Sequence, residues 1–133
     1  MAKVIAICGK ICSGKTFYAN EIKTKENAVI LSCDELMGIL FNNDLVKKHD
    51  EIAQKLRRYL FKKSIDIIKT GASVILDWGF WSANDRKQVK RYFEEKNIYC
   101  EIHYLDEGLM KKLKSKWEEP NKNEIDVWCE VKR

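Results

Sequence analysis

An apolar run followed at once by a glycine-rich loop constrains the fold of this chain more than any other feature. Residues 3–8 read Lys-Val-Ile-Ala-Ile-Cys, the kind of run that forms a buried β-strand. Residues 9–16 read Gly-Lys-Ile-Cys-Ser-Gly-Lys-Thr and fit G-x-x-x-x-G-K-[ST], a loop that cradles phosphate between a strand and a helix. Phe17, Ala19 and Ile22 then recur near helical spacing, so both flanks that the pattern requires are present. A plain glycine turn, the alternative, needs neither flank.

Each residue type in this loop has a physical task in binding a nucleoside triphosphate. Gly9 and Gly14 permit backbone angles and a close approach that a Cβ would block. The loop N–H groups then form an anion nest at the positive end of the next helix. Lys15 is expected to reach the β- and γ-phosphates, and Thr16 to offer its hydroxyl to Mg²⁺. The predicted nucleotide-binding residues are Gly9, Lys10, Ile11, Cys12, Ser13, Gly14, Lys15, Thr16 and Phe17. ATP, or another nucleoside triphosphate, and Mg²⁺ are the expected cofactors.

Size and composition predict one domain over residues 1–133, with no room for a separate substrate domain. No apolar run approaches the roughly 20 residues that cross a bilayer, so no membrane partner is expected. The first strand starts too early for a signal peptide. The 5 cysteines form no C-x-x-C pair, which argues against a disulfide framework or a zinc site and for the cytoplasm.

Short β-rich runs alternate with helical ones, which is typical of a parallel sheet covered by helices on both faces. We therefore predict a three-layer α/β fold of the P-loop nucleotide-kinase type, with a parallel sheet of four or five strands. The expected strands are 3–8, 28–31, 72–76 and 98–104. Helices are expected from residue 15 onward and at 35–41, 45–69, 83–96 and 109–117, before an irregular tail. Right-handed crossovers place the functional loops at the carboxyl ends of the strands.

Two carboxylates that follow strands are expected to converge on Lys15 and Thr16. Asp77 closes the third strand, where an acidic residue holds Mg²⁺, often through water, in many P-loop proteins. The alternative for Asp77 is a strand-end cap. Asp34 follows the second strand and is the candidate general base, taking the proton of a substrate hydroxyl that attacks the γ-phosphate.

Asp34 also has a structural alternative, because it can hydrogen-bond to the start of its own helix. Ser32 and Glu35 already have the spacing of a capping box.

Aromatic residues gather around Gly79 at the end of the third strand. Core packing accounts for Phe80, whereas Trp78 and Trp81 are candidates for a platform under a substrate ring, with core packing as the alternative. Arg86 follows a second capping box at 82–85 and is expected on a first helical turn that faces the phosphates. The alternative for Arg86 is a surface or helix-packing role.

The net charge of +5 is carried mostly by lysine and is densest on one expected helix. Its basic residues are Lys47, Lys48, Lys55, Arg57, Arg58, Lys62, Lys63 and Lys69. They form either the solvated face of an amphipathic helix or a surface that attracts a polyanion such as RNA, and charge alone does not decide.

Three segments together resemble the small P-loop kinase-like proteins grouped with zeta toxins, chloramphenicol phosphotransferase and polynucleotide 5′-kinases. They are G-K-I-C-S-G-K-T at 9–16, L-S-C-D-E-L at 31–36 and V-I-L-D-W-G-F-W-S-A-N-D-R at 74–86. The resemblance covers about the first 105 residues and implies a kinase that acts on a hydroxyl. It places Asp34 at the hydroxyl-activating carboxylate, and Asp77 and Arg86 on the acceptor and phosphate side of the cleft.

The family's lid helix, R-x-x-x-R-N, has no clear counterpart after the fourth strand. Lys112 and Lys116 are the only stand-ins, and lysine lacks the bidentate fork of arginine. Residues 106–128 resemble instead the family segment that lies beyond the lid.

These observations predict an ATP- and Mg²⁺-dependent phosphotransferase acting on a small molecule or a nucleic-acid 5′ end. The alternative is a lidless nucleotide-binding protein with little turnover that acts through a partner. The expected catalytic residues are Lys15, Asp34 and Arg86, the metal ligands are Thr16 and Asp77, and the acceptor-side residues are Asp34, Asp77, Trp78, Trp81 and Arg86.

Overall fold

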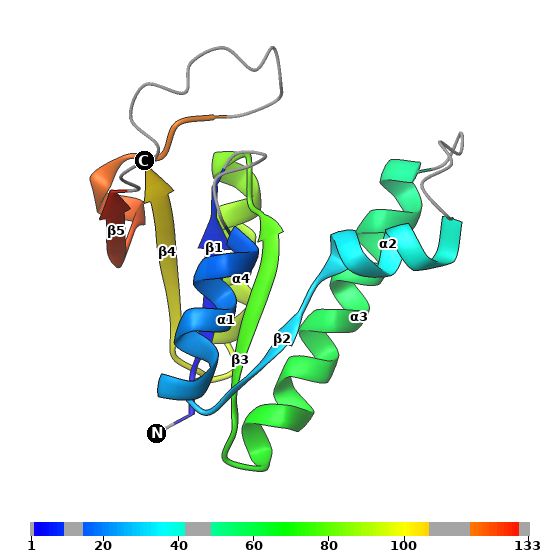
Figure 1. Ribbon diagram of the computed structural model, residues 1–133, viewed down its shortest axis with the longest axis horizontal. Helices are drawn as coiled ribbons and strands as arrows, with labels where there is room; N and C mark the ends of the chain where they lie inside the picture. The colour runs from blue at the N-terminus through cyan, green and yellow to red at the C-terminus, as the bar shows by residue number, and fades with distance from the viewer. Residues whose placement is uncertain (1, 10–14, 42–48, 107–117, 131–133) are drawn as a thin grey trace.

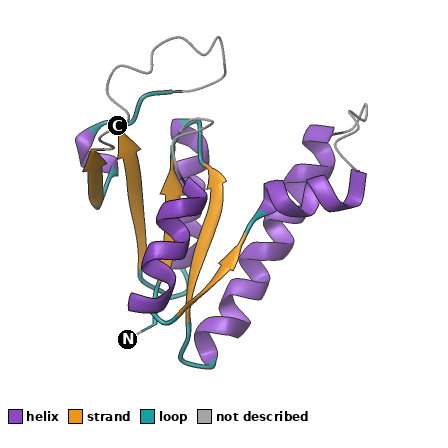
Figure 2. Cartoon of the chain, in the orientation of Figure 1, coloured by secondary structure: helices purple, strands orange, loops and turns teal. Residues whose placement is uncertain are grey.

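The computed structural model describes residues 2–9, 15–41, 49–106 and 118–130. In these ranges five parallel strands form one sheet in the order β2-β3-β1-β4-β5 (Figures 1 and 2). The strands are β1 (Val4–Cys8), β2 (Ala28–Leu31), β3 (Ser73–Gly79), β4 (Cys100–Asp106) and β5 (Val127–Glu130). The predicted parallel α/β sheet is therefore confirmed, with β1 at its centre.

In the described part of the chain, four α-helices cover the sheet. They are α1 (Lys15–Lys25), α2 (Cys33–Phe41), α3 (His49–Lys69) and α4 (Ala83–Glu94). Figure 1 shows α1 in front of the sheet and α4 behind it, with α2 and α3 on the side of β2. No helix of the described ranges is long and apolar enough to cross a membrane.

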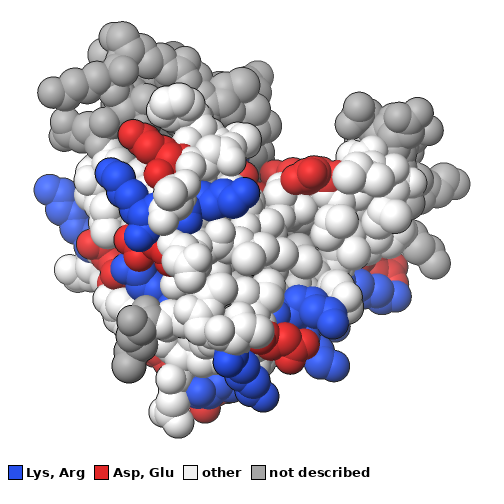
Figure 3. Space-filling model, turned by 60° about the horizontal axis from the view of Figure 1, so that its bottom comes forward, with Lys and Arg blue, Asp and Glu red and all other residues white. Residues whose placement is uncertain are grey.

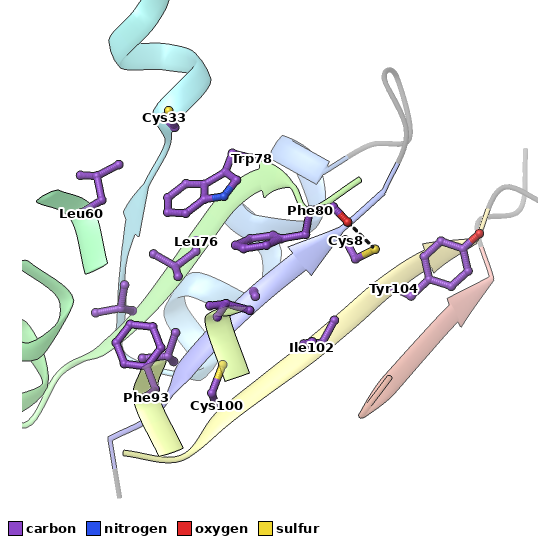
Figure 4. Packing of buried hydrophobic residues seen from close by; sticks show 14 of the residues in the cluster. Cys8, Cys33, Leu60, Leu76, Trp78, Phe80, Phe93, Cys100, Ile102 and Tyr104 are labelled. Carbon is purple, nitrogen blue, oxygen red and sulfur yellow. Dashed lines mark hydrogen bonds between the residues drawn. The ribbon is translucent and has the colours of Figure 1, made fainter. Parts of the chain in front are cut away.

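The hydrophobic core is divided between the two faces of the sheet, because successive strand residues point to opposite faces. Ile5, Ile7 and Ile75 pack with Ala19 of α1 on one face. On the other face Val4, Leu76, Val89 and Phe93 belong to a larger cluster that continues into α2 and α3 (Figure 4). All five residues of β1 are buried, as expected for a central parallel strand.

Serine hydroxyls fix where two helices begin. The Ser32 Oγ accepts the Glu35 N–H at 3.1 Å, and the Ser82 Oγ accepts the Asp85 N–H at 3.0 Å. Each bond satisfies one backbone donor that the first turn of a helix leaves without a partner. Both helices therefore start directly after a strand end, where the sequence predicted functional residues.

The expectation of an irregular tail is wrong for the last described segment. It contains a short 3₁₀ helix (Lys122–Glu124) and then β5, whose Val127 pairs with His103 of β4. The carboxylate of Asp126 anchors this strand by accepting the Ile102 N–H at 2.6 Å and by pairing with the Lys90 ammonium at 2.7 Å. The helix expected at 109–117 lies outside the described residues.

Candidate active site

The described part of the phosphate loop joins the ends of two neighbouring strands. Gly9 is buried, and its N–H donates to the carbonyl of Gly79 at 3.0 Å, which ties the end of β1 to the end of β3. Lys15 and Thr16 open α1, and Phe17 is 76 % exposed beside them. The other predicted loop residues, Lys10, Ile11, Cys12, Ser13 and Gly14, lie outside the described ranges.

Asp77 is the buried carboxylate of this site, with only 6 % of its surface exposed. Burial raises the pKa of the Asp77 carboxyl, the positive charge of Lys15 opposes this shift, and the negative charges of Asp34 and Glu35 add to it. These charges act on Asp77 because β1, β2 and β3 end at the same edge of the sheet. Lys15 and Asp34 thus both lie within electrostatic reach of Asp77.

Asp34 is exposed in the first turn of α2. The hydroxyl that caps this helix belongs to Ser32, which precedes it by two residues. The Asp34 carboxylate stands on the exposed side of the site, whereas Asp77 forms its buried side.

Thr16 and Asp77 fit a Mg²⁺ ion by their chemistry, because a hydroxyl and a carboxylate are hard oxygen donors. A cation would also offset the cost of burying the Asp77 charge. No group of three or more His, Cys, Asp or Glu side chains suited to a metal occurs among the residues described. Phosphate and water oxygens would therefore complete the coordination sphere, as is usual for Mg²⁺.

Arg86 lies in the first turn of α4, after the Ser82 cap, as the sequence predicted. Its side chain is 1 % exposed, and Nη1 donates to the carbonyls of Phe80 at 2.9 Å and Trp81 at 3.2 Å. Nη2 donates to the carbonyl of Glu118 at 2.8 Å and lies 3.7 Å from the Glu124 carboxylate. Because both Nη atoms of Arg86 donate to backbone carbonyls inside the protein, the described contacts fit the packing alternative.

The two tryptophans of the expected platform differ in their surroundings. Trp78 is 5 % exposed and is stacked between Phe61 and Phe80, with ring centroids 5.7 and 5.1 Å away. Figure 4 shows Trp78 and Phe80 side by side above the sheet. Trp81 is half-buried, and its indole lies so close to Gly79 that a Cβ there would approach Trp81 Nε1 to 2.7 Å. Trp78 therefore packs in the hydrophobic core, which was the alternative to a substrate platform.

Sequence reasoning missed a cavity of about 470 Å³ between α3 and α4. It is lined by Gln54, Arg57, Arg58, Phe61, Trp78, Phe80, Asn84, Asp85, Gln88, Arg91, Tyr92 and Glu95. Two signals point to it: the alternation along β3 turns Trp78 to the face opposite Asp77, and Gln54, Arg58 and Phe61 share one face of α3 by their spacing.

The basic helix is only partly a solvated surface. Lys55 and Lys63 are exposed and pair with Glu51 and Asp66 of the same helix, whereas Arg57 is half-buried. On the face drawn in Figure 3, basic and acidic side chains alternate and do not form one continuous basic area. Lys47 and Lys48 lie outside the described ranges, as do the lid stand-ins Lys112 and Lys116.

Comparisons with known proteins agree with the fold. Residues 4–123 match the sequence model of a family described as AAA domain. No curated protein matches the chain.

Solved structures with a similar fold include three of different kinds. The Mycobacterium tuberculosis APS kinase CysC in complex with AMPPNP and APS is 18% identical, with a TM-score of 0.75 over 99% of this chain and 90% of that one. A sugar kinase from a Janibacter species is 13% identical, with a TM-score of 0.64 over 98% and 86% of the two chains. A chain of the Pnkp1/Rnl/Hen1 RNA repair complex is 21% identical, with a TM-score of 0.62 over 82% and 34%. At these identities the likeness establishes the fold.

Proposed function

This chain belongs to the AAA-domain family, and from that premise we propose that it is an ATP- and Mg²⁺-dependent phosphotransferase acting on a hydroxyl group. The observation that carries the proposal is that Lys15, Asp34 and Asp77 follow or close parallel strands that end at one edge of the sheet. Two of the similar folds are named kinases, one of them in complex with a nucleotide analogue, which supports the same chemistry. We also propose that residues 1–133 act as one domain.

In this proposal each residue has one role. Asp34 accepts the proton of the acceptor hydroxyl, whose oxygen forms a bond to the γ-phosphorus as the bond to the β-phosphate oxygen breaks. ADP leaves with that electron pair. Lys15 and the loop N–H groups neutralise the phosphate oxygens, while Thr16 and Asp77 would hold Mg²⁺. The ion, when bound, neutralises charge that develops on the β- and γ-phosphate oxygens.

One observation favours a second candidate, a nucleotide-binding protein with slow turnover. Arg86, the arginine expected at the phosphates, is held by the carbonyls of Phe80, Trp81 and Glu118. An arginine on the γ-phosphate contributes about 10³- to 10⁵-fold in rate where it has been measured. The chain would then turn over slowly unless another cationic group, from a partner or a second subunit, reaches the phosphates.

The first experiment is a thermal-shift measurement with Mg·ATP and Mg·ADP. A ligand at 100 times its Kd adds about 2.7 kcal/mol to the free energy of unfolding, so a clear rise in melting temperature is expected. Lys15→Ala should remove most of the rise, whereas Lys23→Ala, at the far end of α1, should keep it. A melting temperature that millimolar Mg·ATP, Mg·ADP, Mg·GTP and Mg·GDP all leave unchanged would contradict both candidates.

A cytoplasmic location is part of the proposal. It is supported by the 4 described cysteines Cys8, Cys33, Cys100 and Cys129, none of which forms a disulfide. Burial raises the pKa of the Cys8 and Cys100 thiols to about 12, so both stay protonated at neutral pH.

A further inference from the structure

The cavity between α3 and α4 has an aromatic wall. Phe80, Trp78, Phe61 and Tyr92 follow one another with ring centroids 5.1, 5.7 and 5.1 Å apart. All four line the cavity, and their rings belong to the packed side of the sheet. Trp78 and Phe80 are almost fully buried, so the half-buried Phe61 and Tyr92 are the rings that offer apolar, polarisable surface to a flat ligand.

Arginines surround the same cavity. The sequence contains 5 arginines, and 3 of them, Arg57, Arg58 and Arg91, line it. The Nε–H of Arg57 is buried and has no hydrogen-bond partner among the described residues. Asp85 and Glu95 are the acidic residues of the lining, so the cationic groups outnumber them. Planar guanidinium groups match the geometry of phosphate oxygens.

Three exposed amides complete the lining: Gln54, Asn84 and Gln88. An amide side chain both donates and accepts hydrogen bonds, so it can pair with the polar edge of a heterocyclic base. The rings and amides of the cavity suit the base of a nucleotide, and its guanidinium groups suit the phosphate.

The cavity lies on the face of the sheet that α3 and α4 cover, near the strand ends that carry the phosphate loop. Trp78 directly follows Asp77 in β3, but its side chain lies on the other face of the sheet. Phe80, which also lines the cavity, follows Gly79, whose carbonyl accepts the Gly9 N–H at 3.0 Å at the start of the phosphate loop. Arg57 reaches Cys33, the residue before Asp34: burial raises the pKa of the Cys33 thiol, and the charge of Arg57 and a hydrogen bond from it oppose this shift. The cavity therefore lies beside the backbone at the ends of β1 and β3 and at the start of α2, on the face of the sheet opposite the Asp77 side chain.

We propose that this cavity is the acceptor site, and that the acceptor is a nucleotide unit with a free hydroxyl and a phosphate group. The inference rests on the proposed phosphotransferase function and assigns its substrate class. The unit is either a free mononucleotide or the end of an RNA strand, which present the same base and phosphate. Gln54, Asn84 and Gln88 take the base edge, and Arg58 with Arg57 takes the phosphate.

Equilibrium binding to the Lys15→Ala protein tests the cavity apart from the phosphate loop. The probes are adenosine 3′-monophosphate, adenosine, inorganic phosphate, a short RNA with a 5′-hydroxyl, and a cationic aminocyclitol. We expect adenosine 3′-monophosphate to bind at least about tenfold more tightly than adenosine, because a hydrogen bond to a charged group is worth that much or more. If the RNA binds more tightly than the mononucleotide, the acceptor is the end of an RNA strand. If the two bind equally, the acceptor is the free nucleotide.

Two cavity variants and one matched control sharpen the test. Arg58→Gln should weaken binding of the mononucleotide about tenfold or more, and Gln88→Ala should weaken adenosine and its monophosphate equally. Lys63→Gln removes one positive charge from the side of the same helix that faces away from the cavity by its spacing, and should change either affinity less than about twofold.

Transfer from Mg·ATP by the wild-type chain separates this inference from the proposed function. Binding that Arg58→Gln weakens, without transfer to any probe, would overturn phosphotransfer and leave a nucleotide site. If the chain transfers phosphate to the aminocyclitol or to adenosine, and Arg58→Gln does not alter the rate, the cavity assignment is wrong. The proposed phosphotransferase function would then still stand. Adenosine 3′-monophosphate binding no more tightly than adenosine would overturn the cavity assignment as well.

Discussion

The guanidinium of Arg86 donates to the backbone carbonyl of Glu118 at 2.8 Å, although 32 residues separate them in the chain. The Glu118 N–H in turn donates to the carbonyl of Trp81 at 2.7 Å. Arg86 therefore joins the connection between β3 and α4 to the segment that leads into β5. This single arginine holds two distant parts of the backbone together.

Removing this arginine should destabilise the fold. Arg86→Ala leaves the carbonyls of Phe80 and Glu118 without their buried donor, and a loss of about 3 to 5 kcal/mol in the free energy of unfolding is expected. Denaturant titration measures this loss. Lys87→Ala, exposed on the same helix, should change the free energy of unfolding by less than about 0.5 kcal/mol. A stable Arg86→Ala protein that loses only ATP affinity would restore the phosphate role.

A pair of glycine variants should isolate the close approach at the end of β3. Gly79 and Gly71 both have positive φ, +88° and +93°, so alanine at either costs roughly 1 to 2 kcal/mol in backbone strain. At Gly79 the new Cβ would also lie 2.7 Å from Trp81 Nε1 and 3.2 Å from the Gly9 carbonyl, whereas at Gly71 it meets nothing.

We therefore expect Gly79→Ala to lower the melting temperature more than Gly71→Ala and to weaken ATP binding, because it displaces the start of the phosphate loop. Thermal scans with and without Mg·ATP measure both effects. Equal losses in the two variants would mean that Trp81 moves aside freely.

Substitutions of Asp34 and of Asp77 should have different effects. Asp34→Asn should keep nucleotide affinity and lower the transfer rate by about 10² to 10⁴, the usual contribution of a positioned base. Glu35→Gln, an exposed change in the same turn, is the control and should transfer at the wild-type rate. Full turnover by Asp34→Asn on the true acceptor would remove the base assignment.

Asp77→Asn should make the nucleotide-free protein more stable. Burial raises the pKa of Asp77, so ionising it at neutral pH costs folding free energy that an amide avoids. Each 1 kcal/mol gained raises the melting temperature by roughly 4 °C in a domain of this size. The same variant should bind ATP with less dependence on Mg²⁺, which titrations at several magnesium concentrations measure. A lower melting temperature would show that Asp77 is a structural cap.

His103 should make stability fall below neutral pH. Burial lowers its pKa from the usual 6.5, although the carboxylate of Glu101 opposes this, and its Nδ1 lies 2.6 Å from the Tyr18 hydroxyl. Below pH 6.5 the unfolded chain therefore protonates His103 more readily than the folded chain does. The contribution of His103 to stability is complete above pH 6.5 and is lost as the pH falls below that value.

The expected loss is at most about 1.4 kcal/mol per pH unit. Urea titrations from about pH 7.5 to about pH 5 measure it, and His103→Asn should flatten the profile. Glu101, whose pKa is also lowered, adds its own loss only below 4.5. An unchanged profile in His103→Asn would assign the dependence to another group.

The sheet could be predicted because its central strands carry an unambiguous signal. β1 and β3 are buried on both faces, and so their sequences are almost continuously apolar. β5 was missed because an edge strand of 4 residues, Val-Trp-Cys-Glu, has no such run. It is fixed by contacts from elsewhere, such as the bond of 2.9 Å that Trp128 Nε1 donates to the Asp106 carboxylate.

The residues of the candidate site also differ in how far the sequence could predict their positions. Lys15, Asp34 and Asp77 follow from chain position, because parallel strands deliver their carboxyl ends to one edge. Arg86 could not be placed, since the carbonyls that hold it come from residues 80, 81 and 118, and no local pattern shows that these meet. Trp78 could have been placed, because strand alternation turns it away from Asp77.

The strand order also sets when the phosphate loop can first form during synthesis. β1 is made before both of its neighbours, since Val4 pairs with Val74 of β3 and with Cys100 of β4. Until those strands exist, the five apolar residues of β1 have no native surface to cover them. Nascent chains that stop between β3 and β4 should therefore engage chaperones that recognise exposed apolar segments, and release should coincide with the arrival of β4.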